Sequence, residues 1–106
     1  MLEKTIEKKV VEHAKKLGFW TRKFVSPNNR GVPDRIFAYK GRIFFIEFKA
    51  PGKKPTALQN LEHSKMFDAG LSIYVITEAE RAKEMMTELK EYVDARENPS
   101  RPDWYL

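Results

Sequence analysis

A nearly continuous apolar run that ends in a carboxylate is the feature that most constrains how this chain folds. The residues from Ile43 to Ile46 are all apolar, and Glu47 and Phe48 follow directly. Apolar residues at successive positions, rather than at alternate ones, predict a central strand that is covered on both faces. A carboxylate in such a strand is costly to bury unless it is paired or coordinates a metal. Glu47 is therefore the first candidate for a functional residue.

The rest of the chain predicts helices and further strands around this one. Apolar residues at steps of three and four predict helices, and short apolar or alternating runs predict strands. The expected elements are a helix from Glu3 to Leu17, a strand from Phe19 to Val25, a loop from Ser26 to Gly31, strands from Asp34 to Tyr39 and from Arg42 to Lys49, a helix from a Thr56 cap to about Ala69, a buried strand from Leu71 to Ile76, and a helix from Glu78 to about Arg96. This order, αβββαβα, predicts an α/β sandwich around one small mixed sheet.

A tight turn at Lys40-Gly41 predicts what lies near Glu47. If the two strands beside this turn form a hairpin, Asp34 pairs close to Glu47 at one end of the sheet. Lys49 follows Glu47 by two residues, so its side chain projects from the same face of the strand. The pattern predicts two carboxylates and one ammonium group that converge on one point.

The length and composition indicate one domain and exclude several kinds of site. The 106 residues are enough for one hydrophobic core and not for two. We expect a single domain over residues 1–97 and a tail over residues 98–106, whose apolar end Trp104-Tyr105-Leu106 docks on its own domain or on a second subunit. The chain has no cysteine, which excludes a disulfide scaffold, a thiol nucleophile and a Cys-based metal site.

The sequence also suggests where the protein works. No apolar run is long enough to span a membrane, and the first residues lack the apolar segment of a secretory signal. We therefore expect a cytoplasmic, reducing setting without membrane contact. The small size fits a phage or mobile-element protein.

The positive charge is concentrated in the first part of the chain. The formal net charge of the whole chain is +5. Residues 1–60 hold 14 Lys and Arg against 5 Asp and Glu, a balance of +9, whereas residues 61–106 hold 6 against 10, a balance of −4. A polyanionic partner such as nucleic acid is therefore expected to contact the first part.

Two carboxylates with a nearby lysine suit the hydrolysis of a phosphodiester. Hard oxygen ligands hold Mg²⁺ or Mn²⁺, which neutralises the phosphate and lowers the pKa of a bound water. A lysine beside the metal orients or deprotonates that water, or stabilises the developing charge. The alternative is a salt-bridged strand pair on a solvated sheet face, which is the usual explanation of an isolated Glu-Phe-Lys sequence.

The combined motif resembles a known nuclease family. Its parts are Gly31 to Arg35, which contains Val-Pro-Asp, then Ile46 to Lys53, then Pro55 and Gln59. Val-Pro-Asp followed by Ile-Glu-Phe-Lys resembles the PD-(D/E)XK nuclease superfamily, and the longer pattern looks like its VRR-NUC branch. The resemblance covers roughly residues 3 to 77. It implies a restriction-endonuclease-like αβββαβ core and a divalent-metal-dependent endonuclease, often a homodimer, that acts on branched DNA such as Holliday junctions.

The resemblance also assigns roles to residues of this chain. It implies that Asp34 and Glu47 are ligands of Mg²⁺ or Mn²⁺, with the Phe48 carbonyl as a third ligand. Lys49 is implied to be the catalytic lysine, and Gln59 matches a glutamine that lies beside the site on the following helix. A single glutamine is otherwise most often an ordinary surface residue.

The family has a further glutamate in its first helix, for which this chain offers two candidates. Glu3 and Glu7 are one helical turn apart and lie on the same face. Spacing to Gly18 favours Glu3 by the VRR-NUC pattern and Glu7 by the archaeal resolvase-like pattern. We favour Glu3 slightly and keep both.

Loops and strand ends beside the proposed site carry residues suited to phosphate oxygens. The candidate DNA-binding residues are Lys23, Ser26, Asn28, Arg30, Arg35, Lys53 and Lys54. Any one of them alone is more typical of a solvated surface. The set as a whole does not look like a reader of base edges, so we expect, partly from the resemblance, recognition of DNA shape or junction geometry over sequence.

Two other hypotheses remain at this point: a DNA-junction-binding module without catalysis, and a nuclease subunit that is active only with a helicase or another partner. Among the remaining residues, His13 and His63 are expected to face solvent, and Trp20 is expected in the core.

Overall fold

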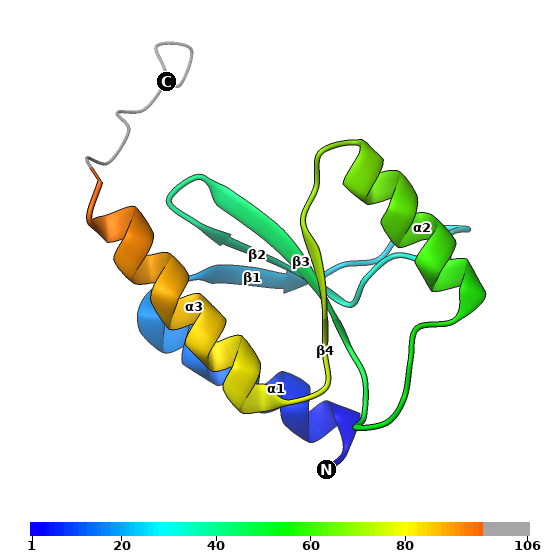
Figure 1. Cartoon of the computed structure of the whole chain (residues 1–106), viewed down its shortest axis with the longest axis horizontal. Coiled ribbons are helices and arrows are strands. Elements are labelled where there is room, and N and C mark those ends of the chain that lie inside the picture. Colours follow the sequence, from blue (N-terminus) through cyan, green and yellow to red (C-terminus); the bar gives the residue numbers. More distant parts are fainter. Residues whose placement is uncertain (97–106) are drawn as a thin grey trace.

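Two helices cover one face of a four-stranded sheet, and a third helix lies over part of the other face (Figure 1). The computed structural model describes residues 1–96. Its elements are α1 (Glu3–Leu17), β1 (Trp20–Lys23), β2 (Arg35–Tyr39), β3 (Arg42–Phe48), α2 (Ala57–Asp68), β4 (Ile73–Ile76) and α3 (Ala79–Asp94). Among these residues no helix is both long and apolar enough to cross a membrane.

The sheet has the strand order β1-β2-β3-β4, so β2 and β3 are its two inner strands. The pairs β1–β2 and β2–β3 are antiparallel, whereas β3 and β4 run parallel and are joined through α2. The mixed sheet and the element order αβββαβα confirm the predicted α/β fold.

Local sequence signals set the ends of the helices. The first helix has the predicted bounds, and Gly18 ends it with a positive φ of 92°, a conformation that favours glycine. The hydroxyl of Thr56 accepts a hydrogen bond from the N–H of Gln59, and the Gln59 side chain accepts one from the N–H of Thr56. This capping box starts α2 where the sequence predicted it.

The two faces of β3 lead to different surroundings. Phe44, Ile46 and Phe48 belong to the core cluster that α1 and α3 form with the sheet. The alternate side chains Phe45 and Glu47 are also buried, on the opposite face. There the ring of Phe45 lies 5.0 Å from the ring of Phe24, and a side chain of α2 contacts Glu47. The central strand is thus covered on both faces over this stretch, as predicted.

The loop before β2 is held closely against α2. A Cβ atom on Gly31 would lie 2.6 Å from the carbonyl oxygen of Leu58, so only glycine fits this approach. The amide of Asn29 donates a hydrogen bond of 3.0 Å to Glu62 of the same helix. These contacts anchor the loop that precedes Asp34.

Several sequence predictions were wrong where an element lies at an edge. The last strand was expected to be buried, yet Tyr74 and Val75 are 41% and 42% exposed because β4 is the edge of the sheet. Trp20, expected in the core, is 48% exposed on the other edge strand, β1. Apolar composition indicates a strand but does not distinguish an edge strand from a central one.

Both histidines were expected to face solvent, and both are instead partly buried. The Nε2 atom of His13 lies 3.0 Å from the hydroxyl of Thr87, where α1 packs against α3. His63 lies on α2.

The end of the predicted domain at residue 97 and the tail over residues 98–106, with Trp104-Tyr105-Leu106, lie outside the described residues.

Candidate active site

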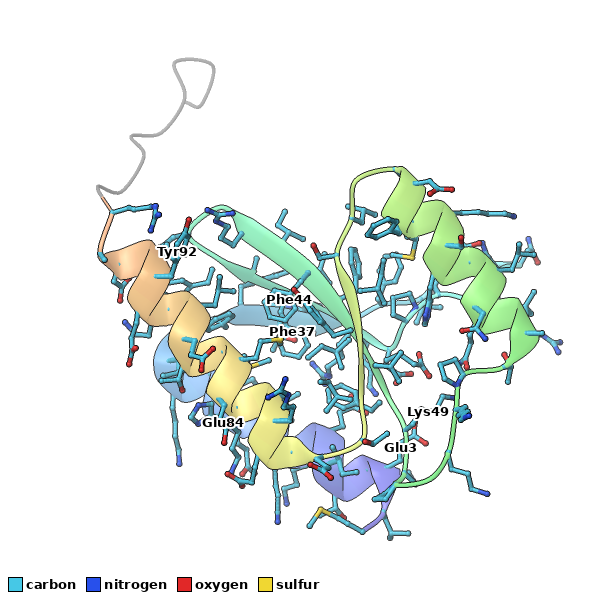
Figure 2. The ribbon with its side chains drawn as sticks, in the orientation of Figure 1. Glu3, Phe37, Phe44, Lys49, Glu84 and Tyr92 are labelled. Atoms are coloured by element: carbon cyan, nitrogen blue, oxygen red, sulfur yellow. The ribbon has the colours of Figure 1, made fainter. Side chains whose placement is uncertain are left out.

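Three carboxylates meet at the end of the sheet where α1 begins. Oxygen atoms of Glu3, Asp34 and Glu47 all lie within 4.8 Å of one another. Arg35 pairs with Ile46 in the hairpin, so the preceding Asp34 comes opposite Glu47. Figure 2 shows Glu3, at the start of α1, near Lys49, which follows β3. Residues distant in sequence thus come together as a group with the ligand chemistry of a metal site.

Glu47 is the most buried member of this group, with 2% of its surface exposed. Its Oε2 atom accepts a hydrogen bond of 2.9 Å from Nε2 of Gln59 and lies 3.3 Å from Nζ of Lys49. Its other oxygen, Oε1, is buried and has no hydrogen-bond partner within residues 1–96. Buried polar atoms are nearly always paired, so an unpaired carboxylate oxygen beside two further carboxylates fits a bound cation.

The Gln59 amide has a defined orientation because both of its ends are engaged. Its Oε1 accepts the N–H of Thr56 at 2.9 Å, which leaves Nε2 to donate to Glu47. The same side chain therefore caps α2 and holds one oxygen of Glu47. The predicted position of Gln59 beside the site agrees with this geometry.

The electrostatics of the group disfavour its full ionisation in the absence of a cation. Burial raises the pKa of Glu47, and the nearby charge of Asp34 raises it further, against the opposing effect of Lys49. Burial also raises the pKa of Asp34, although the N–H of Phe48 donates a hydrogen bond of 2.8 Å to its Oδ2 atom. The role of the Phe48 carbonyl as a ligand stays a prediction.

The two candidates on the first helix have different surroundings. Glu3 joins the carboxylate group, whereas Glu7 accepts hydrogen bonds from Lys23 at 2.6 Å and from Arg35 at 2.7 Å. Burial raises the pKa of Glu7, but these two cations outweigh that effect and lower it overall. The geometry favours Glu3 as the acidic residue of the site and gives Glu7 a structural ion pair.

The candidate DNA-binding residues fall into three groups. Lys23, Ser26, Asn28 and Arg30 line a hollow beside Asp34. Lys53 and Lys54 are exposed in the segment between β3 and α2. Arg35 instead turns its guanidinium toward Glu7 and lies 3.4 Å from the hydroxyl of Thr21.

Sequence reasoning missed His63. This residue lies one helical turn after Gln59, and its Nε2 atom is buried without a hydrogen-bond partner within residues 1–96. Burial lowers its pKa, while Glu62 raises it and Lys49 lowers it further. The spacing of four residues from Gln59 is the signal that could have found it.

Of three comparisons with known proteins, two found a match. No protein-family model matches the sequence. The chain is 48% identical over 75 residues to "Putative nuclease p44" of Acyrthosiphon pisum secondary endosymbiont phage 1, a match that covers 70% of this chain and 81% of the phage protein. A solved structure described as a VRR_NUC domain superposes with a TM-score of 0.73 and 25% identity, over 80% of this chain and 94% of that structure.

The fold and the cluster of the Glu3, Asp34 and Glu47 carboxylates define a protein of the nuclease class. With the similarity to the phage protein and to the VRR_NUC domain, they show that the chain belongs to the VRR-NUC nuclease family.

Replacing Glu47 with glutamine should stabilise the metal-free protein and remove its response to metal. Because the folded-state pKa values of Asp34 and Glu47 are raised, the folded state binds more protons than the unfolded state just above pH 4. The free energy of unfolding therefore falls as the pH rises through that range. At pH 7 in EDTA, we expect Glu47→Gln to raise Tm by roughly 4–8 °C, or about 1 kcal/mol.

Calorimetry at pH 4 to 8, with EDTA and with MgCl₂, measures both effects. The parent protein should gain stability with Mg²⁺, and Glu47→Gln should not. Glu84→Gln makes the same charge change on an exposed part of α3 and serves as the control. An unchanged Tm for Glu47→Gln in EDTA would contradict the unfavourable charge that we assign to this group.

Two substitutions of Gln59 distinguish its capping contact with Thr56 from its hydrogen bond to Glu47. Gln59→Glu keeps a capping-box side chain but puts a fourth carboxylate beside Glu47, so it should destabilise the metal-free protein more at pH 8 than at pH 5. Gln59→Ala should cost about 1 kcal/mol through loss of the cap, with only a small further loss at pH 8 because Glu47 loses a hydrogen-bond donor. Urea unfolding in EDTA measures the difference. Parallel pH profiles for the two variants would show that Gln59 does not interact with Glu47.

Proposed function

We propose that this protein is a divalent-metal-dependent endonuclease that hydrolyses phosphodiester bonds of branched DNA, such as four-way junctions. The observation that carries the proposal is the environment of Glu47, which lies in a cluster with the carboxylates of Glu3 and Asp34. Its Oε1 is buried without a hydrogen-bond partner within residues 1–96, and its Oε2 lies 3.3 Å from the ammonium group of Lys49. The nuclease named in the phage relative and the VRR_NUC neighbour support the same chemistry. The proposal puts the protein's work inside the cell, and the phage relative fits a phage origin.

The carboxylates of Glu3, Asp34 and Glu47, with the Phe48 carbonyl, are the proposed ligands of Mg²⁺ or Mn²⁺. Oxygen ligands of this kind suit both ions, although they do not distinguish between them. A divalent ion held there supplies positive charge to the phosphate and lowers the pKa of a water molecule.

The neighbouring side chains have complementary roles in this proposal. Lys49 lies within 3.3 Å of Glu47 and is only partly exposed, so its ammonium group is held at the site. It orients the attacking water and stabilises negative charge that develops on the phosphate. Gln59 keeps one oxygen of Glu47 occupied and so helps to fix the orientation of this carboxylate beside Glu3 and Asp34.

Recognition in this proposal depends on the DNA backbone. The hollow lined by Lys23, Ser26, Asn28 and Arg30 offers cationic and polar donors beside Asp34, and the exposed Lys53 and Lys54 add charge in the segment between β3 and α2. Such groups suit phosphate oxygens, which carry no sequence information. Selectivity would then come from the shape of the branch point.

A cleavage assay tests the catalytic proposal. The parent protein should cut four-way junctions and flaps faster than linear duplex, in Mg²⁺ or Mn²⁺ and not in EDTA. Asp34→Ala and Lys49→Ala should each lower the rate on the order of 100-fold or more. Lys83→Ala, on α3, is the control and should retain the parent rate.

Cleavage in EDTA, or activity that survives both substitutions, would contradict the mechanism. Junction binding with no cleavage in either metal would overturn it in favour of a binding module. Cleavage that appears only when a helicase or another partner is added would overturn the proposal that the chain acts without one.

We propose further that the enzyme works as a homodimer, because paired cuts in a four-way junction need two sites in a fixed relation. Support comes from the sheet face that carries Glu47. Trp20, Ala38 and Ile43 are paired across three strands on this face, and Trp20 and Ile43 are 48% and 54% exposed. An exposed apolar row of this kind suits contact with a second copy of the chain.

Light scattering tests the dimer. The parent protein should have twice the mass of one chain, and Ile43→Glu should be monomeric and nick junctions on one strand at a time. Val25→Glu changes another exposed apolar residue, outside this row, and should stay dimeric. A monomeric parent, or a dimer that persists in Ile43→Glu, would contradict this interface.

A further inference from the structure

A groove along the outer side of α1 is lined by lysines that the proposed active site does not use. Lys4, Lys8 and Lys15 share this groove with Arg35 of β2. The acidic residues in the groove are Glu7 and Glu12. The three lysines are exposed, and none of them forms an ion pair with any residue from 1 to 96.

The three lysines form a line because of their spacing in the helix. Steps of four and seven residues return to nearly the same face of an α-helix, so Lys4, Lys8 and Lys15 lie within one narrow stripe. At 1.5 Å per residue the stripe is about 16 Å long, close to the axial length of five base pairs of DNA. Lys9 and Lys16 are also exposed but lie about a third of a turn away on the helix.

The acidic residues of the groove leave this stripe positive. Glu7 is already paired with Lys23 and Arg35, so its charge is compensated within the protein. Glu12 is the remaining acid in the groove, against three lysines. The groove is therefore a cationic surface whose charge is available to a partner.

The groove begins at the active site. Lys4 follows Glu3 of the carboxylate group, and Arg35 follows Asp34. The ion pair between Lys23 and Glu7 joins the groove to the hollow that contains Ser26, Asn28 and Arg30, because Lys23 lines that hollow and Glu7 lines the groove. Figure 2 shows α1 extending away from the end of the sheet where Glu3 and Lys49 lie.

We propose that a duplex arm of the DNA substrate lies along α1 as it leaves the active site, with its phosphates on Lys4, Lys8 and Lys15. This inference rests on the proposed function, because it extends the substrate path of the same site. The partner chemistry is the phosphodiester backbone, which binds without regard to base sequence and in a salt-dependent way.

Charge reversal on two faces of the same helix tests the proposal. Lys8→Glu/Lys15→Glu changes the stripe, and Lys9→Glu/Lys16→Glu makes the same change of charge on another face of α1. Each pair is placed in the Lys49→Ala background, so that binding is measured without cleavage. The dissociation constant for a four-way junction and for linear duplex is then measured at several salt concentrations in EDTA and in Ca²⁺.

We expect the stripe variant to bind at least 10-fold more weakly than the Lys49→Ala background, with a salt slope shallower by about 2. The Lys9/Lys16 variant should bind less than 3-fold more weakly. Lys8→Gln/Lys15→Gln should change the affinity in the same direction by a smaller factor, without adding acidic residues to α1. Circular dichroism checks that the helix remains folded.

Equal losses in the stripe variant and the Lys9/Lys16 variant, or no loss in either, would overturn the inference. A parent protein that binds DNA through the stripe but does not cleave it would overturn the proposed catalysis and leave the inference intact. A parent protein that cleaves junctions while the stripe variant keeps its affinity would overturn the inference and leave the proposed catalysis intact.

Discussion

The arrangement of this molecule depends on one buried carboxylate in a central strand. Glu47 lies between Ile46 and Phe48 in β3, and burial alone makes its charge unfavourable. The surrounding elements compensate in part, because Gln59 donates a hydrogen bond and Lys49 brings a positive charge to the same oxygen. The second oxygen is buried without a hydrogen-bond partner within residues 1–96. In the proposed function a cation completes this set, so the burial that is expected to destabilise the metal-free protein would also favour metal binding.

Gln59 connects the stability of a helix to the geometry of the site. Its amide oxygen takes the N–H of Thr56 at the start of α2, and its amide nitrogen reaches Glu47. An ordinary capping side chain bonds only to backbone groups at the end of its helix. The Gln59 side chain also bonds to Glu47, so the position of α2 helps to determine the position of that carboxylate. The loop before β2 is tied to the same helix through the close approach of Gly31 to Leu58, so Asp34 and Glu47 are both positioned relative to α2.

The sequence predicted this site where short-range geometry was sufficient. The turn at Lys40-Gly41 and the period of two in strands were enough to predict that Asp34, Glu47 and Lys49 come together, and Thr56 as a cap predicted the start of α2. Helical spacing did not separate Glu3 from Glu7, because residues four apart share a face. The distinction arises from tertiary contacts, since Lys23 and Arg35 come from strands that pack beside Glu7.

The sequence also did not predict which strands lie at the edges of the sheet or which polar side chains are partly buried. Apolar composition predicted β4 as a strand but not as an exposed edge, and only the spacing of four residues from Gln59 pointed to the buried position of His63. Both outcomes depend on which neighbours the completed fold supplies. Periodicity describes one element at a time and contains no information about those neighbours.

The positive charge of the first sixty residues has two different uses. Glu7 offsets one of the two positive charges of Lys23 and Arg35 within the protein, so a count of basic residues overstates the charge that is available to DNA. The lysines on the outer side of α1 have no such internal partner among the described residues, and their charge faces solvent. A DNA-binding surface is therefore better identified by subtracting the ion pairs than by locating the highest net charge. By that criterion, the lysines of α1 that have no ion pair within residues 1–96 are the better candidates for DNA contact, on the same helix that contributes Glu3 to the proposed metal site.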